Sequence, residues 1–302
     1  MGRRKKGRAI SGWVNFDKPY DMGSTPAVSR IRRLFDAQKA GHAGTLDPLA
    51  TGVLPIALGE ATKTVSFLQH AAKSYRVDIA FGAATTTDDA EGEIIARSDS
   101  YPDDAALAAA LPAFTGTISQ VPPQFSAIRK DGKRAYALAR AGEAVDLAAR
   151  EVRIDAIHLL ARPDAGHVIL QVDCGKGTYI RALARDLALH LGTQGHVKNL
   201  RRTRVGPFDE KNALGLDKLT RLGHYARDLA ALDACLLPLA TALDDIPALA
   251  ISGDAASRIK QGQAISPHAP PKGSVLLTYE GRELALGTSD GVAVKPVRVF
   301  NL

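Results

Sequence analysis

The chain has 302 residues, 45% of them hydrophobic and 24% charged, and its formal net charge is +7. This composition suits a folded protein with one large domain and one small one, and it excludes wholesale disorder. No run reaches the ~20 apolar residues that cross a bilayer, and the basic N-terminus lacks the apolar core of a secretory signal, so we expect a cytoplasmic protein without membrane contact.

Short patterns of apolar residues predict the elements of the first half of the chain. Val28, Ile31 and Leu34 recur at helical spacing, with Thr25 as a candidate N-cap and Pro26 at the first helical position. In chain order we expect a strand at 12–17, this helix at 26–35, a helix at 60–69, a strand at 75–81 and a short helix at 103–111.

The segment at about 120–150 is long, charged and contains glycines, and we expect one helix in it near 133–141. It is too polar to form a core and too long for an ordinary connection, which is typical of a functional loop. After it, the clearest helix of the chain covers residues 178–191 and ends at Gly192. The elements of the second half are strands at 151–161, 167–174 and 198–206, that helix, and further helices before residue 235.

The Asp-Asp-Ile-Pro segment at 244–247 looks like a domain boundary, because short β-like runs with Gly turns follow it. We therefore expect a basic tail at 1–10, a large domain at 11–245 and a small β-rich module at 246–302. Strands and helices do not alternate regularly, which predicts an α+β fold with a mixed or antiparallel sheet flanked by helices.

Exclusions narrow the chemistry. The two cysteines, Cys174 and Cys235, stand alone, and the eight histidines are scattered, so the sequence predicts neither a disulfide framework nor a metal site. No glycine-rich nucleotide-binding motif is present, so nothing in the sequence supports a nucleotide-binding fold.

The Gly-rich run GHAGTLDPLATG at 41–52 is the segment best suited to hold a reacting group. Pro48 biases Asp47 away from helical geometry and so directs one carboxylate, which could act as a nucleophile or merely cap a turn. Arg181 opens the strong helix and could pair with that carboxylate and keep it ionised, or could lie on the surface. Tyr75 opens a strand, where a half-buried core tyrosine is the ordinary interpretation.

Five separated motifs occur in the order found in bacterial tRNA pseudouridine-55 synthases, and the chain resembles this TruB family over nearly its full length. The resemblance rests on GHAGTLDPLATGVLPIALGEATK at 41–63, KSYR at 73–76, QVPPQFSAIRKDGKRAYALAR at 120–140, GKGTYIRALARDL at 175–187 and LRRTRVGPF at 200–208. It implies a pseudouridine-synthase fold, an RNA-gripping thumb at 120–150 and a PUA-like C-terminal module. It also implies an isomerase that converts the T-loop uridine of tRNA to pseudouridine without a cofactor.

The resemblance assigns roles to residues at matching positions. Asp47 takes the place of the catalytic aspartate, with Arg181 as its partner and Tyr75 stacking on the uracil and removing a proton later. The substrate-binding positions it implies are His42, Tyr179, Leu200 and Lys18. Whether Asp47 attacks C1′ or removes a proton at C2′ stays open. One carboxylate facing an arginine suits isomerisation better than glycoside hydrolysis, which usually needs two carboxylates.

Two basic clusters suit contacts with RNA phosphates: Arg129 and Lys130 in the thumb, and a cluster that includes Arg202. We expect a monomer that binds the T-arm of tRNA without a guide RNA. A tRNA-folding chaperone using the same surface is the alternative, and a guide-dependent complex is a third possibility. The chain departs from the family at Asp21, where a glycine is usual, and this puts the conformation of the loop after Lys18 and Pro19 in question.

Overall fold

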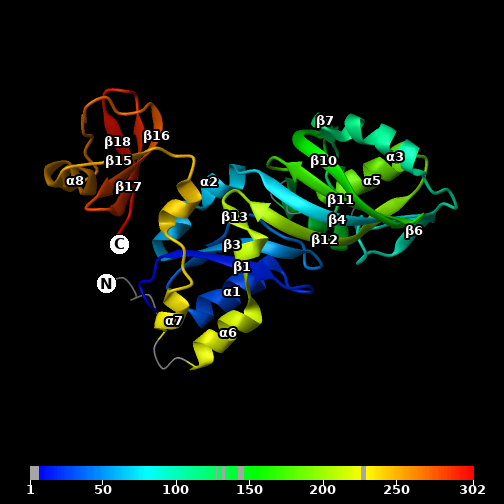
Figure 1. Cartoon of the computed structure of the whole chain (residues 1–302), viewed down its shortest axis with the longest axis horizontal. Coiled ribbons are helices and arrows are strands. Elements are labelled where there is room, and N and C mark those ends of the chain that lie inside the picture. The colour runs from blue at the N-terminus through cyan, green and yellow to red at the C-terminus, as the bar shows by residue number, and fades with distance from the viewer. Residues whose placement is uncertain (1–6, 127, 131–132, 142–145, 226–228) are drawn as a thin grey trace.

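The computed structural model describes residues 7–126, 128–130, 133–141, 146–225 and 229–302. Within these ranges it leaves out the side chains of residues 129, 130, 133, 134, 137, 139, 140, 224 and 225. Figure 1 shows a long sheet with helices against it and a small β module at the C-terminal end. No helix within the described residues is both long and apolar enough to span a bilayer.

One large mixed sheet forms the body of the molecule. Most neighbouring strands are antiparallel, whereas β1 with β14 and β3 with β12 run parallel. This confirms the predicted α+β class. The strand order is β14 (Leu214–Gly215), β1 (Gly12–Lys18), β3 (Thr51–Leu58), β12 (Gly195–Val205), β4 (Lys73–Phe81), β11 (His167–Cys174), β10 (Arg150–Asp164) and β7 (Gly116–Gln120), with β2 (Ala40–His42) on β3 and β13 (Phe208–Asp209) on β12.

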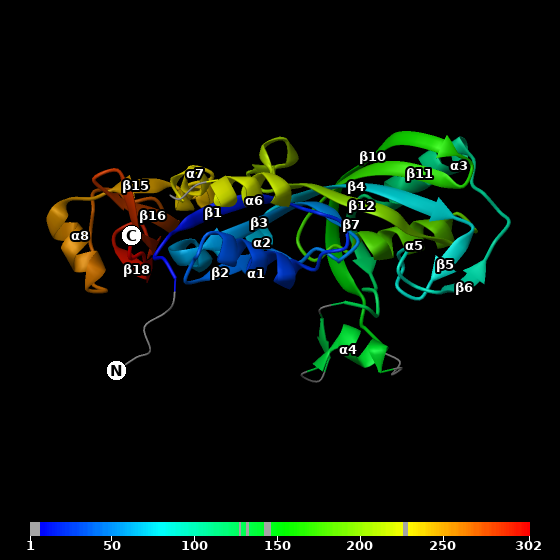
Figure 2. The same cartoon turned by 90° about the horizontal axis from the view of Figure 1, so that it is seen from below.

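The helices and short elements lie around this sheet, and Figure 2 shows α1 and α5 on the same side of it. The α-helices of this part are α1 (Ser24–Leu34), α2 (Val65–His70), α3 (Asp104–Ala110), α5 (Ile180–His190), α6 (Leu216–Tyr225) and α7 (Ala230–Asp233). The remaining elements are η1 (Gly59–Lys63), η2 (Leu111–Phe114), η3 (Glu210–Asn212), η4 (Leu239–Leu243) and the hairpin of β5 (Ala83–Thr85) and β6 (Ile94–Arg97).

Strand β4 is buried along most of its length, with Arg76 exposed and Asp78 half-buried. Tyr75 pairs with Val172 on β11 and with Arg202 on β12, and cross-strand partners share a face. Tyr75 and Val172 belong to the same buried core as the apolar residues of α5, such as Leu183. Tyr75 therefore points to the helix side of the sheet.

Two predicted helices differ from the structure. Helix α1 begins at Ser24 instead of residue 26, with Gly23 rather than Thr25 at the N-cap, and the Ser24 hydroxyl bonds Leu46. The helix expected at 60–69 divides into η1 and α2, with Thr64 between them at a φ of −103° and a ψ of −2°.

The thumb segment projects from the sheet as a separate small unit, visible at the bottom of Figure 2. It contains β8 (Arg129–Lys130), β9 (Lys133–Arg134) and α4 (Ala135–Arg140), and it has a small apolar cluster of its own around Ala135 and Leu147. The helix predicted near 133–141 is confirmed by α4.

The C-terminal module is a four-stranded sheet with its own apolar core, which confirms the predicted β-rich module. Two contacts seat it on η1: the Lys63 ammonium donates to the Val299 carbonyl at 2.7 Å, and the Asn301 amide donates to Glu60 at 2.9 Å. The elements are β15 (Ala248–Ala250), α8 (Gly253–Lys260), β16 (Gly273–Tyr279), β17 (Arg282–Ser289) and β18 (Val294–Val299).

Candidate active site

Asp47 lies on the loop between β2 and β3, and hydrogen bonds hold the preceding residue, Leu46, in place. The Ser24 hydroxyl accepts from the Leu46 amide and donates to the Leu46 carbonyl, each at 2.8 Å. At the end of the loop, Gly52 has a φ of 100°, and a Cβ there would lie 2.2 Å from the carbonyl oxygen of Arg202. Only glycine fits at that point. The loop thus presents the Asp47 carboxylate, whose side chain is 37% exposed, in a fixed direction.

Lys18 supports the loop that carries Asp47 through hydrogen bonds to main-chain carbonyls. Its side chain is fully buried, and its ammonium donates to the carbonyls of Pro19, Met22 and Pro48 at 2.9, 2.6 and 3.0 Å. Burial lowers its pKa to about 8, while the charge of Asp47 acts in the opposite direction. In this arrangement the hydrogen bonds of the Lys18 ammonium go to the protein's own backbone, and substrate contact at Lys18 stays a prediction.

Arg202 supports the same loop from the sheet. It is 1% exposed and donates to the carbonyls of Val53 at 2.8 Å and of Thr45 and Gly44 at 3.2 Å each. The guanidinium is turned to the protein's own main chain, and the phosphate contact expected at Arg202 stays a prediction. A run of basic residues on a strand alternates between faces, and Arg202 falls on the buried one.

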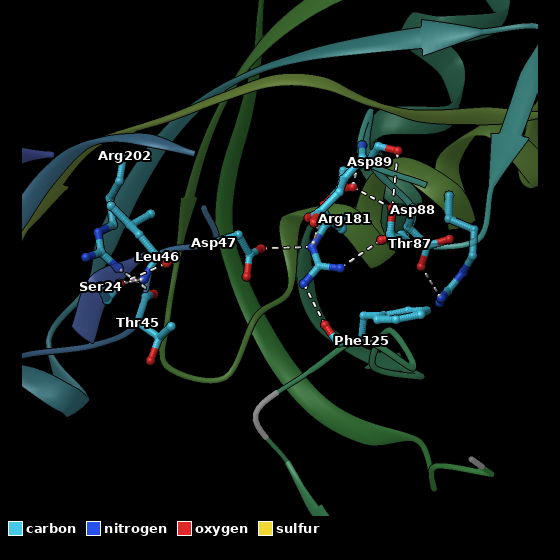
Figure 3. A network of polar contacts seen from close by, with 12 residues as sticks. Ser24, Thr45, Leu46, Asp47, Thr87, Asp88, Asp89, Phe125, Arg181 and Arg202 are labelled. Atoms are coloured by element: carbon cyan, nitrogen blue, oxygen red, sulfur yellow. Dashed lines mark hydrogen bonds and ion pairs between the residues drawn. The ribbon is translucent and has the colours of Figure 1, made fainter. Parts of the chain in front are cut away.

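Arg181 meets Asp47 across the cleft, as Figure 3 shows. Its Nε donates to Asp47 Oδ2 at 2.8 Å, and its two terminal nitrogens donate to the carbonyls of Thr87 at 2.7 Å and Phe125 at 2.9 Å. The side chain is only 5% exposed. Although Arg181 lies off the aliphatic stripe of α5, the loops at Thr87 and Phe125 cover it, so the guanidinium has one orientation.

A second carboxylate, which the sequence reading missed, belongs to the same site. Asp89 Oδ2 lies 3.6 Å from Arg181 Nε, and the other oxygen of Asp89 accepts from the Thr87 hydroxyl at 2.5 Å and from the Glu91 amide at 3.1 Å. Arg181 therefore faces two carboxylates, Asp47 and Asp89. The expectation of a single carboxylate against an arginine is wrong, and the argument from carboxylate number against hydrolysis no longer applies.

Asp89 differs from Asp47 in its surroundings. Asp89 is buried and bonded on both sides of its own turn, whereas Asp47 stands at the open side of the cleft. The Thr-Thr-Asp-Asp run at 86–89 carries no motif that would distinguish a site residue from a turn residue. Asp89 is recognised as a site residue only in the folded structure, where α5 brings Arg181 next to it.

The remaining predicted residues surround this pair. Leu200 lines the pocket with Asp47 and Arg181. Burial raises the pKa of Tyr75, with the Arg202 guanidinium opposing, and it also raises the pKa of Tyr179; the Asp47 charge reinforces both shifts. Both phenols are therefore protonated near neutral pH.

His42 lies next to Arg202 rather than beside the Asp47 carboxylate. Burial, reinforced by the Arg202 charge, lowers the pKa of His42, which makes its imidazole neutral near pH 7. The side chains of Arg129 and Lys130 lie outside the described part of the chain, so their predicted phosphate contacts stay predictions.

The space between Asp47, Asp89, Arg181 and Leu200 is small, with a cavity of about 10 Å³. That volume holds about one water molecule. A larger planar group enters only if the walls separate. Within the described residues, no cluster of three or more His, Cys, Asp or Glu side chains is arranged to hold a metal ion.

Asp21 stands where the family usually has a glycine, and its backbone adopts a conformation that glycine favours. Asp21 has a φ of 56°, a left-handed conformation that aspartate tolerates better than most residues. We expect Asp21→Ala to cost about 1 kcal/mol in the free energy of unfolding and Asp21→Gly to change it by less than about 0.5 kcal/mol. Urea denaturation measures both. Asp99→Ala, at an exposed position without a positive φ, is the control; equal losses at both positions would contradict the strain argument.

Comparison with known proteins places the chain among RNA-modifying enzymes. Residues 32–180 match the TruB family pseudouridylate synthase N-terminal domain, and residues 181–244 match the tRNA pseudouridylate synthase B C-terminal domain. Proteins named tRNA pseudouridine synthase B are similar over the full length: that of Caulobacter vibrioides is 54% identical, covering 100% of both chains, and that of Dinoroseobacter shibae is 51% identical, covering 99% and 98%.

Solved structures share the fold. A Cbf5–Nop10–Gar1 complex contains a chain that is 27% identical with a TM-score of 0.74, covering 95% of this chain and 84% of that one. An H/ACA RNP bound to a substrate RNA containing 2′-deoxyuridine contains a chain that is 24% identical with a TM-score of 0.76, covering 100% and 92%.

Proposed function

The chain belongs to the TruB family of pseudouridylate synthases, and from that premise we propose that it isomerises the T-loop uridine at position 55 of tRNA with Asp47 as the nucleophile and without a cofactor. The family and the full-length relatives establish an RNA pseudouridine synthase, an isomerase that acts on tRNA. The contact between Asp47 and Arg181 in a cleft lined by Leu200 carries the finer proposal.

The reaction breaks one bond of a sugar carbon and then forms another bond to the same carbon. The N1–C1′ bond of the uridine breaks, the uracil turns, and its C5 joins the same carbon, so atoms balance without a cofactor. Asp47 can attack C1′ or take a proton from C2′ to release a glycal; its open position in the cleft is compatible with both. Arg181 holds the carboxylate in place through a charge-assisted hydrogen bond.

The base must leave its stack to reach Asp47, which costs a few kcal/mol. Stacking on the rings of Tyr75 and Tyr179 can return about 1–3 kcal/mol per base. The resting cavity has room for about one water molecule, so the walls must separate for the base to enter. A base that then fills the site leaves no room for the water that would hydrolyse the broken bond.

The last step removes the C5 proton. Tyr75 is the proposed base, but its raised pKa keeps it a phenol at rest. A route in which Asp47 takes the proton, or in which Arg202 stabilises a transient phenolate, meets this constraint. Asp89 is proposed to hold Arg181 rather than to react, since it is buried and bonded within its own turn.

Binding of the T-arm is proposed to use the thumb, where Arg129 and Lys130 would contact phosphates. We propose that the enzyme acts as a monomer in the cytoplasm, without a guide RNA. Support for independence from a guide comes from relatives that match the whole chain and carry the name of a single enzyme.

The test is incubation of the purified full chain with a T-arm stem-loop transcript in EDTA, followed by mapping of pseudouridines. We expect one modified position, the T-loop uridine, in a reaction that needs no added RNA, metal or cofactor. Modification at another site, or only after addition of a second RNA or a cofactor, would overturn the finer proposal.

Lys18 is expected to make the rate fall as the pH rises through about 8. Burial holds the pKa of this ammonium below the 10.5 of a free lysine, so it is charged below about 8 and neutral above. A neutral amine lacks the charge beside Asp47 and has too few protons for its three carbonyl partners. Single-turnover rates should fall by up to about tenfold per pH unit above this pKa.

The control for this pH dependence is a second buried lysine. Burial also lowers the pKa of Lys73 to about 8, but its ammonium bonds carbonyls at the end of α2 and not the Asp47 loop. Lys73→Met should keep the fall near pH 8, and Lys18→Met should lose it. Persistence of the same step in Lys18→Met would show that another group titrates.

A further inference from the structure

Gln120 makes an unusual paired contact at the base of the thumb. It is the last residue of β7, is 2% exposed, and lies 59 positions from its partner. Its side-chain oxygen accepts from the Tyr179 amide at 2.9 Å, and its side-chain nitrogen donates to the Tyr179 carbonyl at 3.2 Å. One amide side chain thus satisfies both main-chain groups of one residue, as a neighbouring strand would.

The partner of this contact begins the helix that carries the arginine. Tyr179 is the N-cap of α5, and in the described part of the chain its side chain makes no capping hydrogen bond. The free amide groups of a helix start need an acceptor, and Gln120 supplies one from another element. Arg181 follows two residues later, so the conformation of Tyr179 sets where the ring and the guanidinium point.

Two further bonds join the same segment to α5. The Val121 carbonyl accepts from Arg185 at 2.8 Å, and the Phe125 carbonyl accepts from Arg181 at 2.9 Å. These two bonds hold arginine side chains, whereas the Gln120 side chain bonds the backbone of the helix start. The base of the thumb therefore forms part of the wall of the site, and Gln120 is the residue that bonds this wall to the first residue of the helix start, Tyr179.

We propose that Gln120 is a positioning residue for the isomerisation: its amide fixes the main chain of Tyr179 and thereby aims the Tyr179 ring and the Arg181 guanidinium at Asp47. This inference rests on the proposed function. The role requires a donor and an acceptor on one side chain, which glutamine has. Glutamate of the same shape keeps the acceptor and loses the donor, and methionine of similar volume loses both.

The experiment measures single-turnover rate and tRNA affinity separately for Gln120→Glu and Gln120→Met. We expect Gln120→Met to slow the bound reaction by about 10- to 100-fold, because a small misplacement near the reacting atoms has effects of this size. Gln120→Glu should fall between Gln120→Met and the unaltered protein. The dissociation constant for tRNA should change by less than about threefold, since only the transition-state geometry is affected.

Gln38 serves as a control: it lies between α1 and β2, is half-buried, and its side-chain amide donates to the Gly7 carbonyl at 3.0 Å. Gln38→Met should leave the rate unchanged. If Gln120→Met does not fold, as judged by thermal melting, the isosteric Gln120→Glu carries the test. A rate within twofold of the unaltered protein, or a loss confined to tRNA affinity, overturns the inference. Failure of the unaltered protein to modify the T-loop would instead overturn the proposed function.

Discussion

Asp47→Asn is expected to lower the single-turnover rate of pseudouridine formation by on the order of 10⁴-fold or more, the scale seen when a reacting carboxylate or its equivalent is removed. The amide has nearly the same shape and can still accept the bond that Arg181 donates at 2.8 Å. It lacks the charge and the nucleophilic or basic oxygen that either route needs. Quantification of pseudouridine in a T-arm transcript at saturating enzyme measures the loss.

The loss should be chemical and not structural. Arg181 keeps its bonds to the Thr87 and Phe125 carbonyls, so the free energy of unfolding should change by no more than about 1 kcal/mol. Binding of tRNA should be nearly unchanged. Asp17→Asn is the matched control: Asp17 is similarly exposed and also pairs with an arginine, Arg201. Modification that survives in Asp47→Asn would mean that another group carries the reaction.

Arg181→Met is expected to damage both rate and stability. The substitution leaves the buried carboxylate of Asp89 without its cation and two backbone carbonyls without donors, and breaking a buried pair costs about 3–5 kcal/mol. The rate should fall by at least about 100-fold, because the Asp47 carboxylate is no longer held. Denaturant unfolding and single-turnover kinetics give the two values.

Arg181→Lys separates charge from geometry. Lysine keeps the positive charge but cannot donate in three fixed directions, so most of the rate loss should remain while part of the stability returns. Arg162→Met is the control, because Arg162 binds a carboxylate, that of Asp104, and two backbone carbonyls, but lies near the end of β10 and contacts neither Asp47 nor Asp89 in the described bonds. Equal rate losses at both arginines would refute a specific role for Arg181.

The order and type of the main elements could be predicted because they depend on local patterns. The apolar stripe of α5, its end shortly before Gly192 and the alternation in β11 all arise from neighbours in sequence. The first turn of α1 could not be predicted, because Ser24 is used to hold Leu46, a residue that only folding brings near.

The site also has one part that could be predicted from local sequence and another that could not. The loop that presents Asp47 is built from its own glycines and from Pro48. The motifs around it were enough to indicate the family and to suggest that Arg181 pairs with Asp47. The burial of Lys18 and Arg202 could not be predicted, because a cation in a short motif looks the same whether it faces RNA or the protein's own carbonyls.

By itself, the sequence determined which groups are present, which segments are helical or extended, and which family the motifs match, because these follow from residue chemistry and short spacing. Tertiary structure alone decided that Asp89 joins Arg181, that Lys18 and Arg202 are buried, and that Gln120 clamps Tyr179. The physical reason is that burial and long-range hydrogen bonds depend on which distant segments meet, and each such contact has a strength set by the water it excludes.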